Sequence, residues 1–301
     1  MTSIAHRLHT ALSGISGILV TPFNSSDQIA PERLKPIIAR CAQAGVDALT
    51  VNGNTGEFYS LSFAEAERMQ AEVPGLIAGR AMVIAGVGRS VAEAMRLAAR
   101  AKADGADAVM VHQPPDPLAA PRGMVEYVRR VADAAGLPVV LYLRNDAIGL
   151  PAIETSCRLP GVVGVKWATP NVMTLAEAIR RLGPDVNFVC GLAEPWAPPM
   201  TAVGARGFTS GLINVAPERS VAIRDALAAG DYTRANTEIT AIEAFEALRR
   251  EESNGANVSV VKTALGFMGL DMGPARPPAA WPLTPAATAA LRDLLGGWRL
   301  A

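Results

Sequence analysis

The sequence predicts an α/β protein, a closed (β/α)₈ barrel of the TIM type followed by a C-terminal helical subdomain. Eight short apolar stretches alternate with stretches of helical periodicity, as in a chain of strand–helix units. The carboxyl ends of these stretches recur every 27 residues on average, at positions 21, 52, 87, 111, 142, 166, 190 and 210. A chain of 301 residues that is 50% hydrophobic can bury a core of this size. A doubly wound sheet of eight strands is the alternative.

The first four strands are predicted where apolar runs end at proline, glycine or a polar turn. Between the first two, apolar residues from Leu34 to Cys41 follow the i, i+3, i+4, i+7 pattern of one helix face. Ser62 with Glu65, and Ser90 with Glu93, have the spacing of a capping box, which predicts that two further helices begin there. We expect these strands at residues 16–21, 48–51, 82–87 and 108–111.

The later strands are predicted at residues 138–142, 162–166, 187–190 and 207–210. They complete the barrel domain, to which we assign residues 1–229. Residues 230–301 are left as a helical subdomain, because the barrel needs no further unit. We expect helices there at 233–252, 258–268 and 284–295, with a turn at 253–255 and a proline-rich link at 274–282. Such a tail more often serves packing or assembly than chemistry.

Composition excludes several classes of function. The formal net charge is zero and the basic residues form no cluster, so nucleic acid and anionic membranes are not expected partners. Three cysteines far apart in the sequence fit a reducing compartment, and three histidines without nearby carboxylates predict no metal site. No apolar run is long enough to span a membrane and no signal peptide is evident, so we expect a cytoplasmic protein.

Lys166 is the candidate nucleophile. The chain has only four lysines, and three of them, Lys35, Lys102 and Lys262, lie in helical stretches where we expect exposed amines. Lys166 instead ends a valine-rich run that reads as a buried strand, and an apolar environment favours the neutral amine that attacks a carbonyl. The alternative is a lysine whose stem is buried and whose amine simply reaches water at the rim.

Other polar residues follow the predicted strands and are expected at the same end of the barrel, where barrel enzymes place their chemistry. Tyr142 ends the strand next to that of Lys166 and could move protons, or it could be a tyrosine anchored at the edge of the core. The turn at 53–57 contains two glycines and could present N–H groups to an anion, or it could be an ordinary strand-to-helix turn. The remaining candidates in these positions are Thr21, His112, Gln113, Arg144, Asn145, Gly191, Thr209 and Ser210.

Taken together, the turn at 53–57, Tyr142 and the Gly-Val-Lys sequence ending at Lys166 resemble the dihydrodipicolinate synthase/N-acetylneuraminate lyase family. The resemblance extends from residues 17–23 to the segment 276–278 of the tail. It implies a barrel with a helical tail, assembled as a homotetramer. It also implies that Lys166 forms a Schiff base with the C2 ketone of a pyruvate-like acid, that Tyr142 relays protons, and that the backbone of Asn54 and Thr55 holds the substrate carboxylate.

Three departures from this pattern argue against lysine biosynthesis. Dihydrodipicolinate synthases carry an arginine five residues after the tyrosine, where this chain has Ala147, and a threonine where it has Asn54. The loop at 112–117 also lacks the aromatic residue that a second subunit contributes in those enzymes. The runs at 53–61 and 142–146, with Thr209 and Ser210, instead resemble the 5-dehydro-4-deoxyglucarate dehydratase branch.

The resulting hypothesis is a lyase that acts on a 2-keto acid, in particular a keto-deoxy sugar acid, by dehydration or carbon–carbon cleavage. No metal or organic cofactor is expected, because the protonated imine on Lys166 serves as the electron sink. Arg144 lies on the same side of its strand as Tyr142 and could bind a distal carboxylate or hydroxyl. The substrate-binding set is Asn54, Thr55, Arg144, Asn145, Gly191, Thr209 and Ser210. The alternatives are a 4-hydroxy-tetrahydrodipicolinate synthase with atypical partner recognition and a non-catalytic keto-acid-binding protein.

Overall fold

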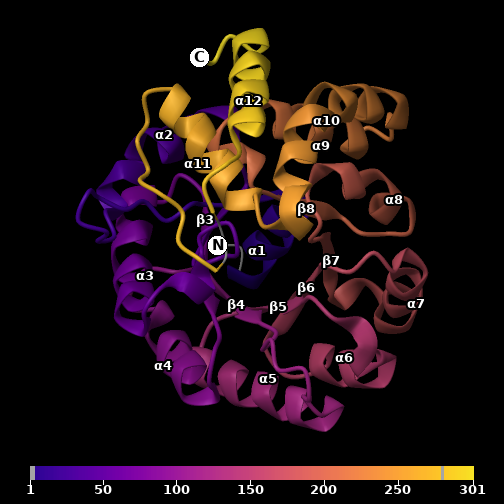
Figure 1. Ribbon diagram of the computed structural model, residues 1–301. Coiled ribbons are helices and arrows are strands. Elements are labelled where there is room, and N and C mark those ends of the chain that lie inside the picture. The colour runs from indigo at the N-terminus through magenta and orange to yellow at the C-terminus, as the bar shows by residue number, and fades with distance from the viewer. Residues whose placement is uncertain (1–3, 279–280) are drawn as a thin grey trace.

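Eight parallel strands form a closed barrel in sequence order in the structure, a computed structural model that describes residues 4–278 and 281–301 (Figure 1). The last strand pairs with the first, with Thr209 opposite Ser16, so the sheet has no edges and the doubly wound alternative is wrong. The strands are β1 Ile15–Ile18, β2 Ala48–Val51, β3 Met82–Val87, β4 Ala108–His112, β5 Val139–Leu143, β6 Val162–Trp167, β7 Asn187–Cys190 and β8 Gly207–Ser210.

A ring of helices surrounds the barrel (Figure 1). Both predicted capping boxes are confirmed: the side chains of Ser62 and Ser90 accept hydrogen bonds from the backbone of Glu65 and Glu93. The ring consists of α2 Lys35–Ala44, α3 Phe63–Ile77, α4 Val91–Ala101, α5 Pro121–Ala135, α6 Leu150–Cys157, α7 Val172–Leu182, α8 Ala197–Ala202 and α9 Pro217–Ala228.

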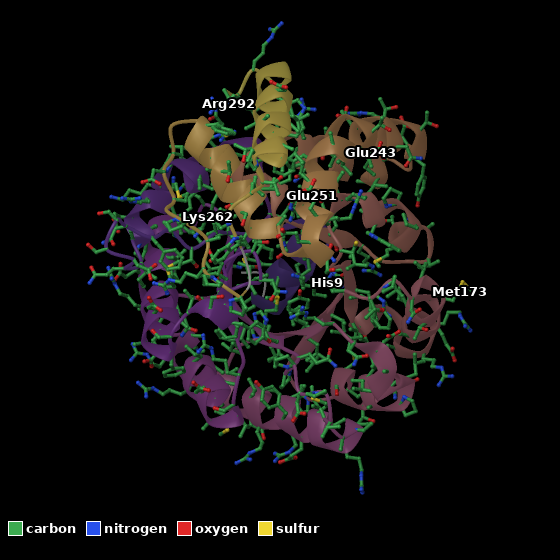
Figure 2. The ribbon with its side chains drawn as sticks, in the orientation of Figure 1. His9, Met173, Glu243, Glu251, Lys262 and Arg292 are labelled. Atoms are coloured by element: carbon green, nitrogen blue, oxygen red, sulfur yellow. The ribbon has the colours of Figure 1, made fainter. Side chains whose placement is uncertain are left out.

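A helix that we did not predict, α1 Ile4–Leu12, closes the amino-terminal end of the barrel. Its Leu8 and Leu12 are buried against the small apolar side chains of the barrel interior. Asn187, the first residue of β7, donates a hydrogen bond from Nδ2 to the carbonyl of His9, which Figure 2 labels (3.0 Å). The spacing of Ile4, Leu8 and Leu12 was the available sequence signal. Within residues 4–278 and 281–301, α1 therefore covers this end, which leaves the opposite end of the barrel for a ligand.

The first strand is shorter than the predicted 16–21, since β1 ends at Ile18. Leu19 N–H still donates to the carbonyl of Thr50, but Val20 N–H donates to the side chain of Asn214 instead (3.2 Å). A side chain from the loop after β8 therefore takes over the hydrogen bond that a longer ladder would have made.

The tail contains α10 Tyr232–Asn254, α11 Asn257–Phe267 and α12 Pro285–Gly297, close to the predicted ranges. Figure 1 shows these helices gathered over one side of the barrel. Helical geometry breaks inside α10, because Glu251 is extended and Glu252 and Ser253 are left-handed. The break begins two residues before the predicted turn at 253–255. Residues 279–280 of the predicted proline-rich link lie outside the described residues.

The prediction of an exposed amine holds for Lys35 and Lys102 but is wrong for Lys262, which is 5% exposed. Its Nζ lies 2.5 Å from Oε1 of buried Glu57 and donates to the carbonyl of Pro274 (3.0 Å). The helical pattern around Lys262, labelled in Figure 2, could not show that a carboxylate from the turn after β2 packs against that face. This buried ion pair connects the tail to the barrel.

The apolar core has two layers, one between the strands and the ring of helices and one inside the barrel. All three cysteines are free and buried. Within residues 4–278 and 281–301, no helix combines the length and apolar character needed to cross a membrane.

Candidate active site

Lys166 and Tyr142 lie side by side near the carboxyl ends of β6 and β5. They are direct partners in the parallel pairing of these strands, and Nζ of Lys166 lies 4.0 Å from the centre of the Tyr142 ring. Both side chains are about 95% buried but line the same cavity. The register of two adjacent strands therefore places an amine and a phenol together at one opening, as the sequence predicts.

The barrel-mouth cavity, as we call it, has a volume of about 340 Å³ and lies at the carboxyl end of the strands. This size is within the range of small-molecule sites in proteins. Strand ends and the loops after them form most of its wall, and the tail forms the rest. Its lining includes Ile18, Asn54, Thr55, Tyr142, Arg144, Lys166, Ala168, Gly191, Leu192, Ala193, Pro195, Trp196, Thr209, Gly211, Glu246, Arg249, Arg250, Asn254 and Asn257.

Burial, together with the smaller effect of the charge of Arg144, lowers the pKa of Lys166 from 10.5 to about 7. The face of the Tyr142 ring attracts the ammonium form and opposes this shift, by about 0.5–2 kcal/mol at most. Burial prevails, so a large share of the amine is neutral near pH 7. A side chain at Gly191 would collide with the Lys166 stem, which explains the glycine at this place in the wall.

Tyr142 is a neutral phenol whose oxygen accepts a hydrogen bond. Nδ2 of Asn54 donates a hydrogen bond to the phenol oxygen (3.0 Å). Burial raises the pKa of Tyr142 to about 12 despite the opposing charge of Arg144 and this hydrogen bond. Because Asn54 occupies the oxygen as a donor, the phenol proton remains available for another acceptor.

His112 supports the ring of Tyr142 from behind. Its own ring stacks on Phe58 with centroids 4.5 Å apart and meets the Tyr142 ring edge-on at 5.2 Å. Nε2 lies 2.9 Å from the carbonyl of Asn52, and burial lowers the pKa of His112 to about 3. The neutral imidazole must then donate from Nε2, because the carbonyl can only accept. His112 thus helps to fix the phenol but does not line the cavity.

The turn at 53–57 folds back on itself. Gly56 N–H donates to the carbonyl of Gly53 and Glu57 N–H to that of Asn54, while Thr21 Oγ1 donates to the carbonyl of Gly56 (2.6 Å). Among the described residues, nothing accepts a hydrogen bond from the N–H groups of Asn54 and Thr55. These two neighbouring donors are at the cavity wall, an arrangement that suits an anion.

The structure brings most of the predicted site residues together. Lys166 and Tyr142 are joined at the cavity by the predicted binding residues Asn54, Thr55, Arg144, Gly191 and Thr209.

Two of the predicted binding residues do not line the cavity. Ser210 is fully buried behind the wall, where its Oγ accepts a hydrogen bond from Ile213 N–H (3.2 Å) and lies 3.1 Å from Oγ of Ser220. Alternation along β8 explains this, since Thr209 faces inward and its neighbour must face the helices. Asn145 instead caps a short turn by accepting from Ala147 N–H (2.9 Å).

The tail contributes to the cavity, whereas we expected it to serve packing or assembly more than chemistry. Arg249 is held between Oε1 of Glu246 (2.5 Å) and Oδ1 of Asn257 (2.7 Å), and Arg250 and Asn254 line the same wall. Reading strand ends cannot find these residues, because they come from helices far along the chain. The adjacent arginines just before the 253–255 turn were the only available signal.

The site has no obvious place for a metal ion. Among residues 4–278 and 281–301, no three histidine, cysteine or acidic side chains are grouped so as to bind one. The chemistry that the residues themselves can support is nucleophilic attack by Lys166 and proton transfer by Tyr142.

Sequence comparison finds relatives along almost the whole chain. A model of the dihydrodipicolinate synthetase family matches residues 11–296. A 4-hydroxy-tetrahydrodipicolinate synthase from Geobacter metallireducens is 33% identical over 257 residues, which cover 83% of this chain and 87% of the relative. A probable 5-dehydro-4-deoxyglucarate dehydratase from Methylobacterium radiotolerans is 28% identical over 291 residues, 95% of each chain.

Solved structures with the same fold include two with clear similarity. The dihydrodipicolinate synthase from Oceanobacillus iheyensis superposes with a TM-score of 0.93 at 36% identity, covering 99% of this chain and 100% of the other. A prophage protein of the dihydrodipicolinic acid synthase family from E. coli K12, solved in complex with pyruvate, gives a TM-score of 0.85 at 25% identity, covering 96% and 99%.

Proposed function

Because the chain belongs to the dihydrodipicolinate synthetase family of lyases, we propose that Lys166 forms a Schiff base with a 2-keto acid in the barrel-mouth cavity. The observation that carries this proposal is the Lys166 amine, buried 4.0 Å from the Tyr142 ring at the only open end of the barrel that the described residues leave. Membership of this family confirms the predicted lyase class and argues against the non-catalytic alternative.

The first step is attack of the neutral Lys166 amine on the C2 ketone. The amine passes one of its two protons to the ketone oxygen, and with a second proton from Tyr142 this oxygen leaves as water; the imine keeps the other N–H proton and is therefore protonated. Tyr142 is suited to supply a proton to that oxygen, because its raised pKa keeps the phenol protonated at neutral pH. The hydrogen bond from Asn54 then stabilises the phenolate until it regains a proton. Asn54 is a positioning residue in this scheme, since an amide does not relay protons.

The substrate carboxylate next to C2 is assigned to the turn after β2. The N–H groups of Asn54 and Thr55 provide two donors, and Arg249 lies near Thr55 on the same wall. The imine draws electrons from C3, so a proton can leave that carbon. The resulting enamine can expel a C4 hydroxyl. In the alternative, loss of the proton of the C4 hydroxyl breaks the C3–C4 bond, which releases an aldehyde and passes the electron pair to the imine as an enamine.

For the substrate class we propose a keto-deoxy sugar acid. A cavity of about 340 Å³ with polar groups from several strands suits a substrate longer than pyruvate. Arg144 lines this cavity and could bind a hydroxyl or carboxylate remote from C2. The relative named as a 5-dehydro-4-deoxyglucarate dehydratase is consistent with this class.

A second candidate is condensation of pyruvate with aspartate semialdehyde, because relatives at 33% and 36% identity are named as synthases of that type. Against it stand Ala147 and Asn54, which occupy positions where the family resemblance expects an arginine and a threonine. Loss of aspartate semialdehyde in the presence of pyruvate and enzyme would favour the synthase. Turnover of a keto-deoxy sugar acid without a second substrate would favour our first proposal.

The test of the Schiff base is reduction with borohydride in the presence of pyruvate, followed by intact-mass and peptide analysis. We expect a reduced pyruvate adduct on Lys166 that is absent from Lys166→Ala. Lys102→Ala, which removes an exposed lysine outside the cavity, is the matched control and should retain the adduct. An adduct on another lysine, or none in the wild type, would refute the proposal.

The homotetramer, the cytoplasmic location and the division into a barrel at 1–229 and a tail at 230–301 belong to the same proposal. The family resemblance supports the tetramer, and three free, buried cysteines fit a reducing compartment. Light scattering of the purified protein would test the oligomeric state.

A further inference from the structure

The tail contributes positive charge to the barrel-mouth cavity. Three arginines line the cavity, Arg144 from the loop after β5 and Arg249 and Arg250 from α10, against a single carboxylate, Glu246. With the Lys166 amine neutral, the wall has a net charge of +2, although the chain as a whole has none. A cavity with this charge attracts anionic substrates.

Arg249 is fixed and already neutralised. Its guanidinium is 7% exposed, contacts Oε1 of Glu246 at 2.5 Å and donates to Oδ1 of Asn257. It lies so close to Gly211 that a side chain there would meet both Nη2 of Arg249 and Oγ1 of Thr55. Arg249 therefore supports the carboxylate turn from behind, and its charge is shared with Glu246.

Arg250 differs from its neighbour, because its charge is unshared. It is exposed at the cavity wall, and no acidic group within residues 4–278 and 281–301 forms an ion pair with it. Arg144, the other exposed arginine of the wall, likewise has no ion pair in this part of the chain. These two guanidinium groups are the ones free to bind an anion.

The backbone immediately after Arg250 is strained, and this strain defines where the regular helix ends. Glu251 is extended, and Glu252, Ser253 and Asn254 follow with φ values of 51°, 58° and 71°. Three successive non-glycine residues in the left-handed region are unfavourable, because their side chains crowd the backbone. This break ends the regular helix at Arg250 and turns Asn254 toward the cavity. In Figure 2 the labelled Glu251 marks this break among the tail helices.

We infer that Arg250, together with Arg144, binds a second carboxylate at the far end of the substrate, so that the enzyme selects dicarboxylic 2-keto acids. This inference rests on the proposed Schiff base. With C2 attached to Lys166 and the first carboxylate at the turn after β2, the rest of the substrate occupies the same cavity, whose wall includes Arg144 and Arg250. A guanidinium there binds a carboxylate through two parallel hydrogen bonds.

The test compares three keto acids as probes in borohydride trapping: 2-oxoglutarate, 2-oxopentanoate, which has the same chain length without the distal carboxylate, and pyruvate. The readout is the concentration that gives half-maximal adduct on Lys166. In the wild type we expect the half-maximal concentration of 2-oxoglutarate to be about 5- to 20-fold lower than that of 2-oxopentanoate. This is the effect expected of one charge-assisted contact at an exposed site. Arg250→Gln should remove most of that preference, and Arg250→Lys should restore part of it.

Arg234→Gln is the matched control, because it removes an exposed arginine from the same helix outside the cavity. It should keep the wild-type preference. If 2-oxoglutarate and 2-oxopentanoate are trapped equally well by the wild type, or if Arg250→Gln keeps the full preference, the inference is wrong while the Schiff base stands. If no probe is trapped on Lys166, the proposed function itself fails.

Discussion

The pH dependence of imine formation tests the electrostatics of the site most directly. Burial and the charge of Arg144 bring the pKa of Lys166 from 10.5 to about 7. At pH 7.5 an amine with a pKa of 7 is about three quarters neutral, whereas one with a pKa of 10.5 is neutral in about one molecule in a thousand. The structure therefore predicts several hundred times more reactive amine than an exposed lysine would provide.

The assay mixes the protein with subsaturating pyruvate for a fixed short time at each pH and then moves every sample to a common pH for borohydride reduction. Intact mass gives the fraction of protein trapped. Imine formation is lost as the pH falls through the pKa of Lys166, because only the neutral amine attacks. Allowing for the attraction of the Tyr142 ring, we expect the midpoint between about 7 and about 8.5. The rate should stay high above it, since the pKa of Tyr142 is raised to about 12.

Two variants identify the cause of the shift. Arg144→Gln should move the midpoint upward, because the charge of Arg144 lowers the pKa of Lys166. Arg144→Lys keeps the charge and should leave the midpoint close to that of the wild type. A wild-type midpoint above about 9 would refute the reasoning, since the buried amine would then titrate almost like an exposed one.

Two further predictions concern the phenol and the tail. Tyr142→Phe should slow deuterium exchange at the pyruvate methyl group, followed by NMR in D₂O, by about 10²–10⁴-fold, the usual range for loss of a general acid or base. Tyr232→Phe, at an exposed tyrosine, should not slow it, and a loss below about threefold for Tyr142→Phe would exclude the proton-transfer role. Lys262→Met should lower the free energy of unfolding in urea by about 3–5 kcal/mol, because Glu57 would remain buried without its cation. Lys102→Met, at an exposed lysine, should change it by less than about 0.5 kcal/mol, and an equally small effect of Lys262→Met would show that the pair is dispensable.

Local patterns were sufficient for most of the fold. The βα period gave all eight strands, and the serine–glutamate spacings at Ser62 and Ser90 gave the starts of two helices, because capping depends on residues three apart in the chain. The helix at Ile4–Leu12 was missed although its apolar spacing is visible in the sequence. The end of β1 could not be predicted from local patterns, because it depends on a hydrogen bond to Asn214, which follows β8 in the chain.

By itself, the sequence determined the barrel and the pairing of an amine with a phenol, since strand order and strand ends place Lys166 beside Tyr142 in any closed barrel of this kind. Neighbouring side chains of a strand face opposite sides, so the sequence also implied that Thr209 and Ser210 cannot both face the cavity. Only the tertiary structure decided which charges surround the amine. Arg249 lies beside Gly211, about 40 positions earlier, and Lys262 pairs with Glu57, about 200 positions earlier, and no local period records such contacts. Their positions depend on how the tail helices pack over the barrel.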